Sequence, residues 1–218
     1  MTTPFRLRGI ASVALVAASS SIAMRSTGAQ GTPPAPPAPP ATMSAPVSAP
    51  MREASQLDLQ GATTQARVIF QKMIDSATDP AAKAAAQRAM AMSYAFDGDC
   101  ANTVKYESMV IAYWATREQA EPQNAYYQQG EMANEAARVC IDAGDLAAAD
   151  QWYRRGYELG VKEPAPQTHP RALWDYRLAH ALGRIAARRG DRAEAQRQIA
   201  TARRLLDSDS AMASQQER

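Results

Sequence analysis

Histidine and cysteine are scarce in this chain of 218 residues, which contains 2 His and 2 Cys. The two histidines, His169 and His180, have no cysteine or acidic cluster beside them at the spacing of metal ligands. We therefore expect no metal site. A glycine-rich phosphate loop, a serine elbow and a recognisable pair of carboxylates are also missing from the sequence, so we assign no catalytic residue and no cofactor. The sequence argues against an enzyme.

Charge is missing from most of the first thirty residues, and its distribution there is typical of an export signal. Arg6 and Arg8 precede an uncharged stretch from Gly9 to Met24, small residues follow, and no acidic residue occurs. The apolar stretch has roughly 15 residues, whereas a membrane-spanning helix needs about 20. We predict a signal peptide over residues 1–29, a periplasmic or secreted protein, and no stable membrane span after cleavage.

Proline is concentrated in the segment that follows. Residues 31–50 hold eight of the 14 prolines, no charge and, apart from Val47, no large aliphatic side chain. Such a composition cannot form a core and favours extended polyproline II. We predict a disordered Pro/Ala-rich linker over residues 30–50.

No excess of positive charge remains once the first 29 residues are set aside. Residues 30–218 contain 21 Lys and Arg against 22 Asp and Glu. Phosphate binding needs a concentrated basic surface, so nucleic acid is a poor candidate partner.

A strand-like alternation of apolar and polar residues is absent from the rest of the chain, where the only periodic pattern is helical. Ala66, Ile69, Phe70 and Met73 recur at spacings of three and four, which makes one apolar stripe. We predict a helical repeat domain over residues 51–207. The polar segment 208–218 lacks this periodicity and is predicted to be a disordered tail.

Three Gly-Asp pairs mark the predicted helix boundaries. Gly98, Gly144 and Gly190 each precede an aspartate and are 46 residues apart. Glycine accepts the left-handed conformation that ends a helix, and the aspartate can cap the next helix. Equal spacing indicates a repeated unit with a tight corner between two helices. A looser corner is expected at Gly61.

Residues at fixed distances from these corners resemble the tetratricopeptide repeat family, in which a small residue and then an aromatic residue follow the corner. The matching pairs are Ala66 and Phe70, Ala149 and Tyr153, and Ala195 and Ile199, whereas Thr103 and Glu107 break the pattern. The resemblance implies an all-α, tetratricopeptide-like right-handed solenoid of about four helical hairpins, with seven or eight helices. An irregular helical bundle is the alternative. Aromatic residues are expected to fill gaps between hairpins or, alternatively, to form a ligand-stacking surface: Trp114, Tyr126, Tyr127, Trp152, Tyr153 and Trp174.

The two cysteines are expected to meet in such an array. Cys100 opens the helix after one corner and Cys140 precedes the next corner, so both would lie at the same end of adjacent hairpins. Disulfides persist outside the cytosol. We predict a Cys100–Cys140 disulfide, with two buried thiols as the alternative.

A binding groove is the remaining functional candidate. In tetratricopeptide proteins the first helices of successive hairpins line a concave face that holds a peptide or a partner's helix. The resemblance places a basic strip there, for which solvated arginines in surface ion pairs are the alternative interpretation: Arg88, Asn134, Arg138, Arg177, His180 and Arg184. Arginine forks suit carboxylates, so we expect an acidic peptide or a chain terminus as ligand.

The sequence therefore predicts a non-catalytic scaffold of the cell envelope that binds a protein or peptide partner. The alternative is a structural or assembly component of the envelope that acts by self-association. A concentration-dependent oligomer without a partner would favour the second interpretation.

Overall fold

The computed structural model describes residues 47–208, and every described element is an α-helix. The predicted signal peptide, most of the predicted linker and most of the predicted tail lie outside the described residues. The helices are α1 (Ala49–Leu59), α2 (Thr63–Ser76), α3 (Pro80–Phe96), α4 (Cys100–Ala115), α5 (Pro122–Ala143), α6 (Leu146–Gly160), α7 (Arg171–Arg188) and α8 (Arg192–Ser208).

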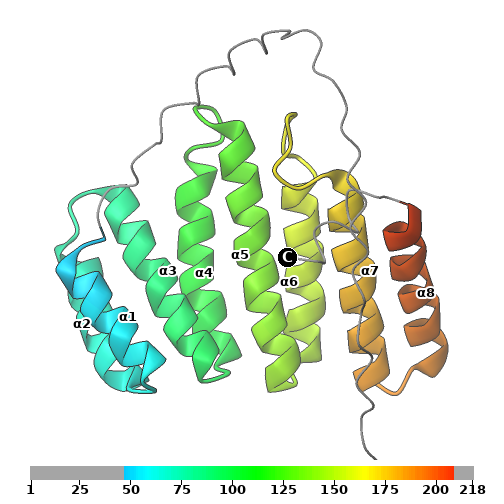
Figure 1. Cartoon of the computed structure of the whole chain (residues 1–218), viewed down its shortest axis with the longest axis horizontal. Helices are drawn as coiled ribbons and strands as arrows, with labels where there is room; N and C mark the ends of the chain where they lie inside the picture. Colours follow the sequence, from blue (N-terminus) through cyan, green and yellow to red (C-terminus); the bar gives the residue numbers. More distant parts are fainter. Residues whose placement is uncertain (1–46, 209–218) are drawn as a thin grey trace, which may run out of the picture. The chain divides into compact units, whose positions relative to one another are not determined.

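These helices form four hairpins, α1/α2, α3/α4, α5/α6 and α7/α8, which stand side by side in chain order (Figure 1). The last helix of each hairpin also contacts the first helix of the next hairpin. The all-α array of four helical hairpins that the sequence predicts is therefore confirmed for the described residues. Because a short hairpin cannot bury its own apolar face, the array is stabilised by packing between neighbours. None of the described helices combines the length and the apolar character needed to cross a membrane.

The predicted corners are the points at which the chain reverses. Gly98, Gly144 and Gly190 have φ values of 70°, 86° and 80°, which is the left-handed region that favours glycine. The aspartate after each glycine caps the next helix: Asp99, for example, accepts from the amide of Asn102 at 3.0 Å. The equal spacing of these pairs thus reflects one local geometry used three times.

The ends of the helical region differ slightly from the sequence prediction. α1 begins at Ala49, two residues before the expected boundary, because the Ser48 side chain caps it and Pro50 fits its first turn. At the other end α8 continues through Ser208. Ala49 and Pro50, which the prediction assigned to the linker, and Ser208, which it assigned to the tail, are therefore helical.

Packing follows the register that the corners set. Ala66 and Phe70 on α2, and Ala149 and Tyr153 on α6, are buried. The equivalent Ile199 on α8 is 44% exposed, because α8 is the last described helix and none of the described residues covers its outer side.

A disulfide joins the second and third hairpins. The Cys100 and Cys140 sulfurs are bonded, with their Cα atoms 4.7 Å apart, and the bond closes a sequence separation of 40 residues. Cys100 is the first residue of α4 and Cys140 lies near the end of α5, so the bond fixes the corner ends of these helices to each other.

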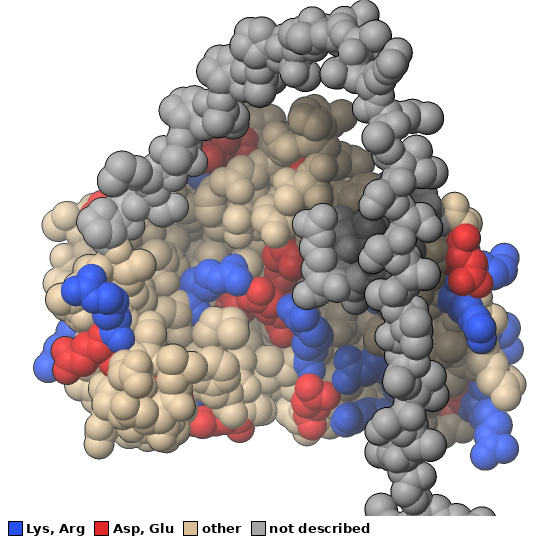
Figure 2. Space-filling model, in the orientation of Figure 1, with Lys and Arg blue, Asp and Glu red and all other residues tan. Residues whose placement is uncertain are grey.

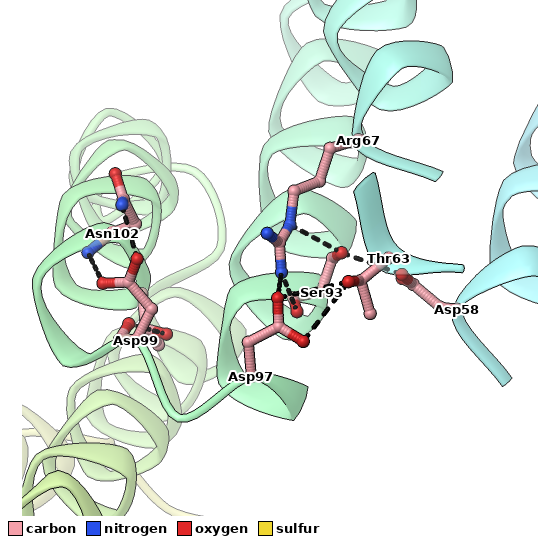
Figure 3. Close-up of polar contacts among 8 residues, drawn as sticks. Asp58, Thr63, Arg67, Ser93, Asp97, Asp99 and Asn102 are labelled. Atoms are coloured by element: carbon pink, nitrogen blue, oxygen red, sulfur yellow. Dashed lines mark hydrogen bonds and ion pairs between the residues drawn. The ribbon is translucent and has the colours of Figure 1, made fainter. Parts of the chain in front are cut away.

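A polar network connects the first two hairpins (Figure 3). Arg67 on α2 donates to the Oγ of Ser93 at 3.0 Å and to its carbonyl at 2.7 Å, and also pairs with Asp97. The Ser93 hydroxyl donates to Asp58 at 2.8 Å, and burial raises the pKa of that carboxyl. The Arg67 guanidinium lies over the Tyr94 ring, 3.9 Å from its centre. We interpret this network as structural, because its members are satisfied by one another.

Candidate functional site

Three cavities share lining residues on α5, and together we call them the α5 trough. Their volumes are about 480, 240 and 260 Å³. Glu131 lines the first and second cavities, Glu135 the first and third, and Arg138 the second and third. These residues are spaced by three or four positions, which places their side chains on one face of the helix. Helices α3 and α4 complete the trough on one side of α5, and α6 and α7 complete it on the other.

The structure brings five of the six predicted groove residues together. Asn134, Arg138, Arg177, His180 and Arg184 line the second cavity. Helical spacing places the three α7 residues on one face, because they recur at intervals of three and four. The packing of the hairpins then brings this face to the same cavity as Asn134 and Arg138 of α5. The sixth, Arg88 on α3, lines the first cavity instead and does not join the other five.

Most of the trough's arginines are held in ion pairs with acidic residues that the groove prediction did not include. Arg88 donates to both carboxylate oxygens of Glu135, at 2.8 and 2.9 Å. Arg177 pairs with Glu131. Figure 2 accordingly shows acidic and basic side chains mixed on one face of the molecule rather than a field of one sign.

Glu131 is the electrostatic centre of the trough. Burial alone would raise its pKa, but the hydrogen bond from His169 and the nearby Arg177 outweigh burial and lower it. His169 belongs to the loop before α7, and its ring lies 3.4 Å from the Glu131 carboxylate. A firmly ionised Glu131 fixes the position of Arg177 in the second cavity.

Two donors of the second cavity have no partner among the described residues. Arg138 is exposed and makes no hydrogen bond or ion pair with residues 47–208. The Nδ2 of Asn134 is buried and likewise lacks an acceptor there. The carboxamide of Asn134 packs tightly on Gly156 of α6, where an added Cβ would lie 2.5 Å from Oδ1. The glycine thus sets the position of this donor.

The second cavity also contains a neutral imidazole and a buried phenol. Burial, and secondarily Arg184, lower the pKa of His180, so this ring is uncharged at neutral pH. It stacks on Tyr176, with ring centres 5.8 Å apart. Burial raises the pKa of Tyr153, which keeps its hydroxyl protonated. The cavity therefore offers hydrogen-bond donors with little net positive charge beyond Arg138.

Sequence reasoning missed Glu107, which borders the third cavity. This α4 side chain is 0% exposed, and neither carboxylate oxygen has a hydrogen-bond partner among the described residues. Burial first, and then the Glu135 carboxylate, raise its pKa to about 8, although Arg88 opposes the rise. The register contained the missing indication: Glu107 follows Gly98 by the interval that separates Phe70 from Gly61 and Tyr153 from Gly144. Both of those aromatic residues are buried.

Among residues 47–208, no three histidine, cysteine or acidic side chains are placed to share a metal ion. The arrangement can instead hold a ligand by hydrogen bonds, ion pairs and ring contacts.

Comparison with known proteins gives little beyond the fold. No protein-family model matches the chain, and no curated protein matches it. Two solved structures are similar to it, both described as a Podosopora anserina putative kinesin light chain with nearly identical TPR-like repeats, one of them a variant with a single substitution. They share 16% identity with this chain, with TM-scores of 0.45 and 0.44. The alignments cover 73% and 74% of this chain and 93% and 95% of the other two.

Proposed function

We propose that this protein is a non-catalytic scaffold that binds a protein partner in the α5 trough, with an acidic group of the partner in the second cavity. The observation that carries the proposal is the pair of unpartnered donors, Arg138 and Asn134 Nδ2, at one cavity. A buried amide without an acceptor costs about 1–3 kcal/mol, and a ligand that supplies the acceptor removes that cost.

A carboxylate is the ligand group that fits these donors best. It can accept from the fork of Arg138 and from the Asn134 amide at the same time, and charge-assisted bonds of this kind are the stronger ones. Arg184, which pairs with exposed Asp142 at 3.2 Å, lies in the same cavity and can exchange that partner for the ligand. Surface pairs of this type contribute only about 0–1 kcal/mol, so the exchange is energetically small.

The cellular setting of the proposal comes from the sequence alone. A signal peptide over residues 1–29 and a Pro/Ala-rich linker would place the helical array outside the cytosol, at some distance from the linker's start. The disulfide between Cys100 and Cys140 is compatible with an oxidising compartment.

Charge reversal tests the trough. The double variant Arg138→Glu, Arg184→Glu should reduce partner binding at least about tenfold, because each change replaces a donor with a like charge facing the ligand. Arg204→Glu, on exposed α8, is the matched control and should bind normally. Unchanged binding by the double variant, measured by capture of the partner identified through cross-linking, would remove the trough from consideration.

A second candidate function, assembly by self-association, is favoured by a cavity of about 600 Å³ on the last hairpin, formed by the end of α7, the corner at Gly190 and α8. Its lining includes Ala187, Ala195, Ala200, exposed Ile199 and two arginines. The last hairpin of a repeat array has no neighbour to cover its outer face, so a second copy of the chain could pack there. Sedimentation over a range of concentrations tests it: an oligomer that Ile199→Glu abolishes supports self-association, whereas a monomer at all concentrations excludes it.

A further inference from the structure

Three aromatic side chains, none of them shared with the second cavity, line the first cavity of the trough. Tyr113 and Trp114 reach it from α4, and Tyr127 reaches it from α5. All three rings are only half-buried. The wall that α3 contributes to this cavity includes three alanines, whose small side chains leave room beside the rings: Ala81, Ala84 and Ala85. With a volume of about 480 Å³, the cavity lies within the range of ~300–1,000 Å³ that is usual for ligand pockets.

Acidic groups outnumber basic groups in this lining. Glu131 and Glu135 are the two acids, and Arg88 is the single base. Arg88 is already held by both oxygens of Glu135 and also donates to the Met132 sulfur. Its guanidinium therefore has few donors left for a ligand, whereas Glu131 and the Gln128 carbonyl retain accepting capacity.

We propose that the first cavity binds an organic cation, the guanidinium or ammonium group of a basic side chain presented by the bound peptide. Aromatic faces attract cations within about 6 Å of the ring centre, most strongly when the cation is partly removed from water. The cavity combines three such rings with the carboxylates of Glu131 and Glu135. Both are already paired with arginines, so they contribute accepting oxygens to the cation more than net charge. The proposal rests on the proposed function only in taking a peptide as the source of the cation.

The second cavity, proposed to bind an acidic group, predicts how charges are spaced along the bound peptide. Gln128 and Glu131 of the first cavity lie ten and seven positions before Arg138 of the second, which is about 10–15 Å along α5 at 1.5 Å per residue. An extended peptide covers that distance in about three to five residues. The partner segment would therefore carry a basic side chain three to five residues from a carboxylate.

The decisive comparison uses two small probes with nearly the same shape. N-acetyl-arginine amide carries one positive charge, and N-acetyl-citrulline amide replaces the guanidinium with a neutral urea. Each is titrated into the full chain while the indole N–H of Trp114 is followed by NMR, with Trp114→Phe used to assign that signal. We expect the arginine probe to bind at least about fivefold more tightly, as a cation–π contribution of about 1 kcal/mol implies. Equal binding of both probes, or no binding of either, overturns the proposal.

A variant that removes a positive charge distinguishes a cation site from an anion site, because the two kinds of site predict opposite changes in affinity for the arginine probe. Arg88→Gln removes the positive charge of the lining and frees Glu135, so binding of the arginine probe should tighten severalfold. Arg184→Gln removes the same charge from the second cavity and should change this binding less than twofold. Weaker binding by Arg88→Gln, with the fold intact by circular dichroism, would show that Arg88 holds the ligand and would overturn the proposal.

These results are independent of the partner. If the arginine probe fails to bind while charge reversal at Arg138 and Arg184 still abolishes partner binding, only the cation proposal is overturned. If the probe binds as expected while charge reversal leaves partner binding unchanged, the cation site stands and the second cavity is excluded as the acidic subsite.

Discussion

Replacing Glu107 by glutamine should stabilise the protein by an amount that grows with pH. Glutamine keeps the shape of the side chain and removes its ionisation. In the native protein Glu107 is fully buried, without a hydrogen-bond partner among the described residues, and near the Glu135 carboxylate. An isolated buried charge is unfavourable, so the group keeps its proton in the folded state.

The pKa of Glu107 sets the size of the effect. Its ordinary pKa of 4.5 is raised to about 8 on folding. Below pH 4.5 both the folded and the unfolded chain carry the proton, and Glu107 has no effect on the pH dependence. Between pH 4.5 and 8 only the unfolded chain releases it, so stability falls by about 1.4 kcal/mol for each pH unit. The total loss approaches roughly 5 kcal/mol at pH 8, and it is the loss that Glu107→Gln should avoid.

Urea unfolding at pH 5, 6, 7 and 8 measures this difference directly. Both proteins share all other titrating groups, so the pH dependences of groups distant from position 107 cancel in the comparison; only Glu135, which faces Glu107, is affected by the substitution. Glu158→Gln, at an exposed position of α6, is the matched control and should follow the native protein at every pH. We expect the advantage of Glu107→Gln to be below about 1 kcal/mol at pH 5 and several kcal/mol at pH 8.

A constant difference across this range would refute the reasoning. It would mean that Glu107 ionises at its ordinary pKa in the folded chain, which requires water or a cation beside it. A glutamine variant that is less stable at pH 8 would refute it as well, because the buried carboxylate would then contribute favourable interactions.

Three further predictions concern the fold. Replacing Cys100 and Cys140 by serine should lower the free energy of unfolding by about 4 kcal/mol, the loop-entropy value for the 40-residue separation, as measured by urea unfolding without reductant. Gly160→Ala should destabilise by about 3 kcal/mol or more, the upper end for overpacking, because its Cβ would lie 2.3 Å from the buried Trp174 ring. Gly98→Ala, with open space but a φ of 70°, should lose only about 1–2 kcal/mol by the same measurement, and equal losses would contradict the close approach. Asp99→Ala should lose about 1 kcal/mol at pH 7 because the helix cap is removed. Hydrogen bonds from Asn102 lower the pKa of Asp99, so the charge-dependent part of the cap's contribution is present above pH 3.8 and is lost as pH falls through the lowered pKa. The difference between thermal melts of the two proteins should therefore be smaller at pH 2 than at pH 7.

Local chemistry explains why the architecture could be predicted from the sequence. Each corner is determined by two adjacent residues, a glycine and an aspartate. The corners at Gly98, Gly144 and Gly190 could therefore be predicted without knowing which distant residues are in contact. Helical spacing likewise aligns Arg138 with Asn134 on α5, and Arg184 with Arg177 on α7. That these two helices would face a common groove was implied by the tetratricopeptide resemblance and not by local chemistry.

The electrostatics of the trough could not be predicted in this way. The ion pair between Arg88 and Glu135 joins residues 47 positions apart and depends on how α3 packs on α5. The aromatic cavity requires α3 to present alanines opposite Trp114, which is again a property of packing. Glu107 is intermediate: its register predicts burial, but only the structure shows that no described residue neutralises it.

Site-specific photo-cross-linking in intact cells tests the central claim most directly. A photoreactive residue is placed at position 138, inside the α5 trough, or at position 204, on exposed α8. We predict that position 138 attaches one discrete protein and that position 204 does not. Attachment from position 204 with none from position 138, or from neither position, would contradict the account that the trough is the binding surface.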